Sequence, residues 1–420
     1  GSASGKPESN LTTMKTSDKL KLPFGFDQCW ELEAKESVTS LLQPNAEPLD
    51  DVASAVSKAL GEPIEFPSMD QSLVSGDSVV FAIDPLLPAM GELLPAILSW
   101  FVERGCSAEN MQLVFAGTQS QLPPELENQI STAVGGEISI EVHDPDNEEK
   151  IAYVAANSDS DPIYMNRTLV DADVVIPVTC ARATSAIDFL GAYSLYPLLS
   201  DRATRGAFYS LGGLGNPKAH ENLTDLANQA AMWAGFLVSI QVIPAGSDRI
   251  SEIHAGLLEP LEKHCEQRMD ELWKTSVSES NLTVALIDGG PAHQNWLGIS
   301  RALHVANRCT ADGGAIVLCT QANEAMGKSM SRLRRDQAAD DVALAKKLNK
   351  DNADDSLAAS LVHQATRDKH LYLVSRMRPS SLENIGVGAL QENRELQHLV
   401  DQFDRTNIFS SAQHRHIVMT

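Results

Sequence analysis

Residues that could bind a ligand or move a proton follow several short apolar segments of this chain. They are Asp84, the turn Gly117 to Gln119, the pair His143-Asp144 and the turn Asp288-Gly289-Gly290. In an open α/β sheet, ligands bind beyond the carboxyl ends of the strands, so these residues are candidates for a site. Two of these residues could instead have a structural role. Asp84 could instead cap the next helix, and His143, beside Asp-Pro in a turn, could be a hydrogen-bonded structural group rather than a base.

Other patterns indicate chemistry less strongly. SLGGLGNP (210–217) lacks the Lys-Ser/Thr of a phosphate-binding loop and the spacing of a dinucleotide fingerprint, which favours an ordinary loop. His414 and His416 could offer two imidazoles on one strand face, but no acidic or cysteine ligand lies nearby at metal-binding spacing. We therefore predict no metal site from the residues alone.

Short β-branched segments alternate with helical patterns, which predicts parallel sheets with crossover helices. The clearest unit is a strand at 78–84, a helix at 89–105 and a strand at 111–117. Within the helix, apolar residues recur at steps of three and four, and Gly105 ends it. Pro95 fits near the first turn of this helix, or else marks a kink.

The rest of the chain continues the alternation. Further strands are predicted at 172–178, 237–244, 283–290, 313–321 and 371–376, and helices at 223–236, 256–274, 295–309, 334–366 (with a break near Asn352) and 393–403. We expect a disordered arm over 1–20, an N-terminal α/β domain over 21–270 and a C-terminal α/β domain over 271–420, each with a mainly parallel sheet flanked by helices and a ligand cleft between them.

Composition excludes several classes of partner. A net charge of −23 without a Lys/Arg-rich block argues against nucleic acid. No apolar segment reaches the roughly 18 residues of a membrane span. The six cysteines are scattered, as in a protein with reduced thiols, so we expect a cytoplasmic protein.

From about Glu47 to the C-terminus, the order of segments resembles the lactate racemase family, whose members use a nickel-pincer nucleotide. The segments that carry the resemblance are EPLDDVASAVSKALGEPI (47–64), FAIDPLLP (81–88), FAGTQ (115–119), VHDPDNEEKIAYV (142–154), MNRTLVDADVVIPV (165–178), LGNPKAHENLTDLANQAAMWAGFLVSIQVIP (214–244) and DGGPAHQNWLGISRAL (288–303). The resemblance implies the two-domain fold and, for an active member, isomerase chemistry on a 2-hydroxy acid.

Reactive residues are replaced where the resemblance implies them. Gln119 and Ala183 stand at the positions of two catalytic histidines, Tyr193 at that of the lysine that anchors the cofactor, and Tyr209 at that of a nickel-binding histidine. Further replacements are Leu87 for an arginine, His293 for an aspartate, Gly298 for a glutamine and Arg301 for a lysine. An amide and a methyl group cannot act as general bases. We therefore predict no nickel-pincer cofactor.

The hypothesis that follows is a lactate racemase-like protein without the standard activity, which binds a small anionic metabolite in the interdomain cleft. Arg182 and Arg301 are the expected carboxylate partners, because a guanidinium offers paired donors; each could equally form a salt bridge. Asp84, Gln119 and Tyr193 would line the opposite wall. The alternatives are a divergent 2-hydroxy-acid racemase or epimerase, with His143 or His293 as base and Tyr193 as proton donor, and a purely structural protein.

Overall fold

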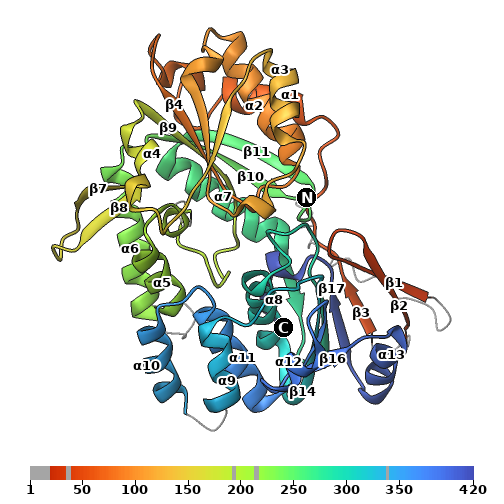
Figure 1. The fold of residues 1–420 in the computed structure, drawn as a ribbon. Helices are drawn as coiled ribbons and strands as arrows, with labels where there is room; N and C mark the ends of the chain where they lie inside the picture. The colour runs from red at the N-terminus through yellow and green to blue at the C-terminus, as the bar shows by residue number, and fades with distance from the viewer. Residues whose placement is uncertain (1–18, 35–38, 192–194, 212–216, 337–339) are drawn as a thin grey trace, which may run out of the picture.

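The computed structural model of the protein describes residues 19–34, 39–191, 195–211, 217–336 and 340–420. Two six-stranded sheets organise these residues, one in the upper half of Figure 1 and one in the lower half. The first sheet has the order β11-β10-β9-β4-β5-β6 and is parallel except for the β10–β11 pair. Its strands are β4 (Val79–Ile83), β5 (Met111–Phe115), β6 (Ser139–Val142), β9 (Val174–Cys180), β10 (Val238–Pro244) and β11 (Ile250–Leu257).

The second sheet is parallel throughout and has the order β16-β15-β14-β13-β17-β3. Its strands are β3 (Thr39–Leu42), β13 (Ser280–Leu286), β14 (Thr310–Cys319), β15 (His370–Val374), β16 (Gly388–Leu390) and β17 (Thr406–Phe409). The mixed α/β class with mainly parallel sheets, expected from the alternating pattern, is confirmed. Parallel strands covered on both faces are apolar throughout, as the five buried residues of β4 illustrate.

Helices cover these sheets. Around the first sheet lie α1 (Val52–Gly61), α2 (Met90–Glu103), α3 (Leu126–Val134), α4 (Arg167–Asp171), α6 (Pro217–Trp233) and α7 (Leu258–Trp273); around the second lie α8 (Trp296–Cys309), α9 (Lys328–Asp336), α10 (Asp341–Asp351), α11 (Ser356–Asp368), α12 (Pro379–Glu383) and α13 (Asn393–Gln402). Helix α5 (Arg202–Leu211) contacts both α10 and α11, so it connects the two halves.

The predicted periodicity of α2 matches its packing. Its apolar residues at three- and four-residue steps, from Leu93 to Phe101, are buried against β4, where Phe81 meets Phe101 edge to face at 5.5 Å. Pro95 lies inside α2 rather than in its first turn. The break expected near Asn352 separates α10 from α11, and Asn352 adopts the left-handed conformation that often ends a helix (φ 48°).

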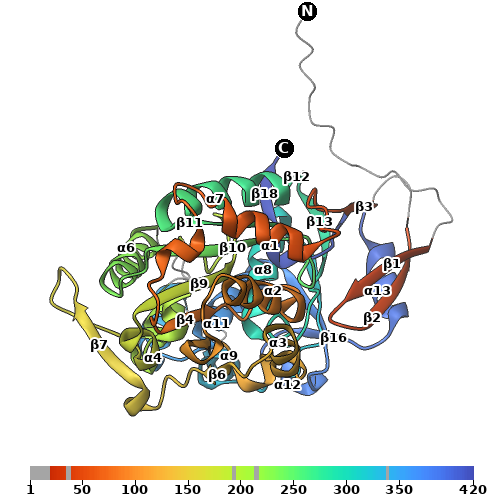
Figure 2. The same cartoon turned by 90° about the horizontal axis from the view of Figure 1, so that it is seen from above.

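Three further strand pairs were not predicted. Two are antiparallel hairpins, β1 (Lys19–Phe24) with β2 (Gln28–Glu33) and β7 (Ile151–Ala156) with β8 (Pro162–Asn166), which project from opposite sides of the molecule in Figure 2. The third joins β12 (Lys274–Val277) to β18 (His416–Met419) in parallel. Lys19 and Leu20 therefore belong to a strand, which corrects the end of the expected disordered arm; residues 1–18 lie outside the described ones.

The first described strands pack with the second sheet, because β3 pairs with β17 and the β1–β2 hairpin packs on the core around β13. Sheet membership therefore does not follow a single division of the sequence, and the domain limits at 270/271 stay a prediction. Among the described residues, every helix is too short or too polar to cross a lipid bilayer.

Candidate functional site

A cleft of about 820 Å³ opens where the two sheets face each other. Its walls come from the segments after β4, β5 and β9, from α5, from the loop that precedes α8, and from the segments after β14 and α10. Most of these segments follow the carboxyl ends of parallel strands, which is where ligands bind in open α/β sheets. The cleft thus lies where the strand-end residues predicted a site.

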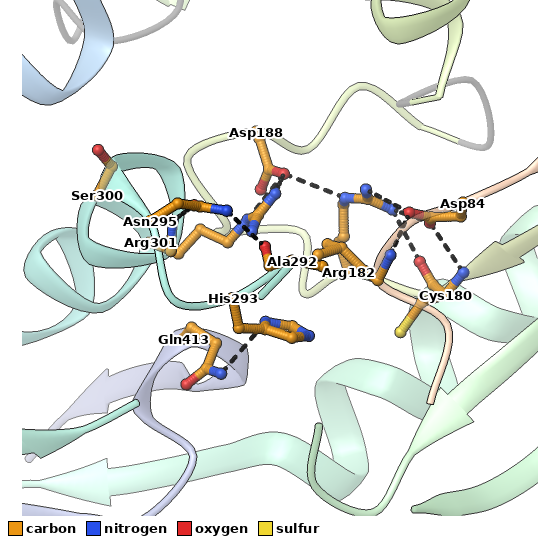
Figure 3. A network of polar contacts seen from close by, with 12 residues as sticks. Asp84, Cys180, Arg182, Asp188, Ala292, His293, Asn295, Ser300, Arg301 and Gln413 are labelled. Carbon is orange, nitrogen blue, oxygen red and sulfur yellow. Dashed lines mark hydrogen bonds and ion pairs between the residues drawn. The ribbon is translucent and has the colours of Figure 1, made fainter. Parts of the chain in front are cut away.

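Arg182 and Arg301 reach the cleft from the two halves of the molecule and meet at one carboxylate (Figure 3). The Nε of Arg182 donates to Oδ2 of Asp188 at 3.2 Å, and the Nε and Nη2 of Arg301 donate to the same oxygen at 3.0 and 2.8 Å. Beyond Arg182 lies Asp84, whose Oδ2 accepts from Nη1 of Arg182 at 2.9 Å. Two arginines and two aspartates therefore form one buried network that links both sheets.

Burial and charge oppose each other within this network. Burial raises the pKa of Asp188, but the nearby charges of Arg301 and Arg182 outweigh it and hold that pKa well below its usual range. Burial lowers the pKa of Arg182, and the charges of Asp84 and Asp188 more than reverse this effect. Asp188 is therefore ionised, and both guanidinium groups are stabilised by carboxylates of the protein itself.

The network is incompletely satisfied. Oδ1 of Asp188 and Nη1 of Arg301 are buried and have no hydrogen-bond partner. A buried polar atom without a partner costs about 1–3 kcal/mol, and such atoms gather where a ligand or water completes the site. Both groups border a second cavity of about 30 Å³, which also touches Tyr209 and His220.

Local sequence explains how the two arginines are held. Oδ1 of Asp84 accepts the N–H of Leu86, and its Oδ2 accepts the N–H of Cys180, so Asp84 joins the ends of β4 and β9. The same Oδ2 accepts from Arg182 and so orients its guanidinium group. Asp84 thus does not line the cleft but holds Arg182, which does.

Arg301 is placed by the start of α8. Asn295 caps this helix by accepting the N–H of Gly298 at 2.9 Å. A Cβ at Gly298 would lie 1.8 Å from the carbonyl oxygen of His293, so only glycine lets the helix begin this close to the preceding loop. Position 298, where the resemblance implies a glutamine, therefore has a packing role in this chain.

The other predicted binding residues are placed differently. Gln119 is exposed at the start of a short 3-10 helix (Gln119–Gln121) and does not line the cleft, whereas its neighbours Thr118 and Ser120 do. Tyr193 lies outside the described residues. Tyr209 lines the cleft, and burial raises its pKa to about 12, so its phenol is neutral. Ala183 is buried in the core beside α7.

His143 is held as a structural group. Its Nε2–H donates to the carbonyl of Ser200 at 2.8 Å, which leaves Nδ1 to accept from Nδ2 of Asn166 at 3.0 Å. Burial is the main cause that lowers its pKa. With both ring nitrogens engaged and no place in the cleft wall, this histidine has no free atom for proton transfer; a catalytic role stays an untested hypothesis.

His293 belongs to a second buried cluster beneath the arginines (Figure 3). Its Nδ1 lies 3.3 Å from Nε2 of Gln413, its Nε2 has no partner, and its ring packs 5.5 Å from that of His414. Nε2 of His414 donates to Ser247, whose hydroxyl donates to Asp288 at 2.7 Å. This cluster joins the segment after β10 to the segment after β13 and the C-terminal residues.

Sequence reasoning missed Asp188, although it contacts both predicted arginines. It is the single charged residue between Arg182 and Asp201 in a largely apolar segment. An isolated carboxylate of this kind, close in sequence to an expected buried guanidinium, was the available indication of its role.

The residues present do not fit a nickel-pincer nucleotide. Where the resemblance implies a nickel-binding histidine, the chain has the neutral phenol of Tyr209, which is a poor ligand for a divalent ion.

Comparison with known proteins agrees with this architecture. Residues 27–192 match the family model described as lactate racemase N-terminal domain. The structure of the lactate racemase apoprotein from Thermoanaerobacterium thermosaccharolyticum superposes with a TM-score of 0.76 at 16% identity, covering 96% of this chain and 100% of that one. A crystal structure of a Thermotoga maritima protein gives 0.65 at 14% identity, covering 90% and 100%.

At these identities the superpositions show the fold alone, and no curated protein matches the chain. The N-terminal part of the chain is thus similar to the lactate racemase N-terminal domain, and over its length the chain has the fold of the lactate racemase apoprotein.

Proposed function

We propose that this protein binds a small anionic metabolite in the cleft through Arg182 and Arg301 and does not perform nickel-pincer racemisation. The observation that carries the proposal is the convergence of these two guanidinium groups, one from each half of the molecule, at the cleft wall. A guanidinium presents planar, paired donors that match a carboxylate. An anion between the guanidinium groups of Arg182 and Arg301 would accept hydrogen bonds from both.

Several cationic side chains that could contact an anion line the cleft. Although the chain carries a net charge of −23, the described residues lining the cleft include more cations than carboxylates. The cations are Arg182, Arg202, Arg205, Arg301 and Lys328, and the carboxylates are Glu324, Asp354 and Asp355. Carboxylates outside the lining pair with the two central cations, Asp84 and Asp188 with Arg182 and Asp188 with Arg301, so an anion would bind by replacing one of these partners.

Loss of the racemase mechanism is supported by the groups at the implied catalytic positions. Proton transfer at a substrate hydroxyl needs a titratable group within hydrogen-bond reach. Gln119 is an exposed amide outside the cleft wall, and Ala183 is a buried methyl group. Neither can replace an imidazole.

The cofactor part of the proposal is tested by producing the protein together with the enzymes that make the nickel-pincer nucleotide. Metal analysis should find far less than one nickel per chain, the absorbance spectrum should lack a cofactor band, and chiral chromatography should detect no interconversion of D- and L-lactate. Stoichiometric nickel with interconversion would establish the alternative, a divergent 2-hydroxy-acid racemase or epimerase.

The binding part is tested by isothermal titration calorimetry with lactate, oxalate and inorganic phosphate. Arg301→Gln should weaken binding by at least about tenfold, since a charged hydrogen bond contributes about 1.5–3 kcal/mol. Arg268→Gln is the matched control, because Arg268 pairs with Glu252 outside the cleft. Equal affinity in the two variants would refute a role for Arg301.

A further inference from the structure

Asp188 supplies a carboxylate that Arg182 and Arg301 both bind in this structure. We propose that the carboxylate of Asp188 is an internal occupant of the anion seat, the pair of guanidinium groups of Arg182 and Arg301. In the strap, residues 184–191, the segment 186–189 would move away from this seat when an anion binds. This inference rests on the proposed function, because it assumes that these two guanidinium groups are the ligand's partners.

The hydrogen bonds of Asp188 resemble those of a bound ligand more than those of a saturated ion pair. Oδ2 alone receives the donors of both arginines, while Oδ1 and Nη1 of Arg301 stay unpaired although buried. Arginine and carboxylate commonly pair through two parallel hydrogen bonds that use both oxygens. An anion free to turn in the seat could reach Nη1 as well, which the tethered Asp188 does not.

The strap is fixed firmly at its first residues. The N–H and hydroxyl of Thr184 donate to Asp270 at 3.0 and 2.7 Å, and the hydroxyl of Ser185 lies 2.9 Å from Nδ1 of His416. The carbonyl of Ser185 also accepts from Nε2 of His304. This end of the strap can therefore serve as the fixed point of a movement.

Beyond Ser185 the strap has irregular structure. Its backbone bonds there include two short turns, from Ala186 to Ala183 and from Phe189 to Ala186, and it contains no helix. The side chain of Asp188 makes its hydrogen bonds to the two seat arginines. Hence an anion that replaces this carboxylate removes the attachment that the side chain of Asp188 gives to this part of the strap.

The strap also contacts both halves of the molecule. Ile187 packs against the core of the second sheet, whereas Leu190 belongs to the core on one face of the first sheet. The adjoining cavity of about 30 Å³ has room for about two water molecules, so packing around the seat is incomplete. Displacing Asp188 would thus break the Arg301–Asp188 bridge between the halves and couple anion binding to their relative position.

Competition by Asp188 lowers the apparent affinity for anions, because only the fraction of molecules with an open seat can bind. Asp188→Ala should therefore bind lactate at least about tenfold more tightly than the unmodified protein in calorimetric titrations. Glu252→Gln is the matched control, since Glu252 is a half-buried carboxylate paired with Arg268 outside the cleft; the affinity of this variant should not change.

A second variant, Asp188→Asn, keeps the proposal testable if Asp188→Ala does not fold. Asp188→Asn keeps the shape of the side chain but weakens its hold on the arginines, so it should bind lactate more tightly than the unmodified protein, by less than Asp188→Ala. Acetate should also raise the melting temperature of Asp188→Asn more than chloride does at equal ionic strength, with no such difference in Glu252→Gln.

Amide hydrogen exchange reports the movement directly. Saturating lactate should speed exchange at residues 186–189 of the unmodified protein, because the strap leaves the seat. Unchanged or slower exchange there would overturn the displacement.

The outcomes separate the two proposals. If the unmodified protein binds lactate, Arg301→Gln abolishes binding and neither Asp188 variant gains affinity, Asp188 is not a competitor but the anion seat stands. If neither the unmodified protein nor the Asp188 variants bind lactate, acetate or inorganic phosphate, both proposals fail.

Discussion

Mild acid should destabilise the protein through His414, which is buried where the two halves meet. Burial lowers the pKa of His414 to about 4, because the uncharged ring is favoured away from water; nearby Asp288 only partly offsets this effect. The unfolded chain takes up a proton near the ordinary pKa of 6.5, while the folded protein resists protonation until about pH 4. Stability is therefore complete above about pH 6.5 and is lost as the pH falls toward 4.

The size of the loss follows from the two pKa values. Each pH unit between them changes the free energy of unfolding by up to about 1.4 kcal/mol, so the contribution of His414 reaches roughly 3 kcal/mol near pH 4. The neighbouring imidazole of His293, whose pKa is also lowered mainly by burial, adds a loss of the same sign.

Urea unfolding at about pH 7 and about pH 4.5 measures this loss. His414→Gln can keep a donor toward Ser247 but does not titrate, so it should lose roughly 2 kcal/mol less than the unmodified protein between the two conditions. Its stability at about pH 7 is the control for packing damage. An identical pH dependence in both proteins would refute the assignment of acid sensitivity to His414.

Three further predictions concern buried polar groups. Arg182→Met should destabilise the protein by about 3 kcal/mol, because Asp84 is left buried without its cation, and a second change, Asp84→Asn, should recover part of the loss; thermal unfolding measures both. His143→Ala should lower stability by about 1–3 kcal/mol while lactate affinity by calorimetry stays unchanged; a large loss of affinity would contradict its structural assignment. Arg415→Met should also lower the melting temperature, because the carbonyls of Ser410 and Leu42 lose their donor, and an unaltered melting temperature would show that this buried arginine is dispensable.

Local patterns predicted most of the elements. The apolar steps of α2, the charged helical region broken at Asn352 and the β-branched segments of β4, β5, β13 and β14 each match an element of the structure within a few residues. These features depend on neighbours in sequence, so periodicity and turn residues suffice to find them. The hairpins β1–β2 and β7–β8 and the addition of β3 to the second sheet were missed. In β1 exposed and buried residues alternate, so a period-two pattern was available there, whereas β3 has only four residues, too few for a periodic pattern.

The site depends on distant pairs. Arg301 meets Asp188 across 113 positions, and Ser247 meets His414 across 167. Residue type indicated that Arg182 and Arg301 could bind a carboxylate, but not that the chain supplies its own carboxylate in Asp188. Likewise, the pairing of His143 with Asn166 and Ser200 required the tertiary structure.

The most direct test of the anion seat is a crystal structure of the protein grown with saturating lactate. We expect a lactate carboxylate within hydrogen-bond distance of both Arg182 and Arg301, with Asp188 displaced from them. Lactate bound elsewhere in the cleft, while both arginines remain closed on Asp188, would contradict it.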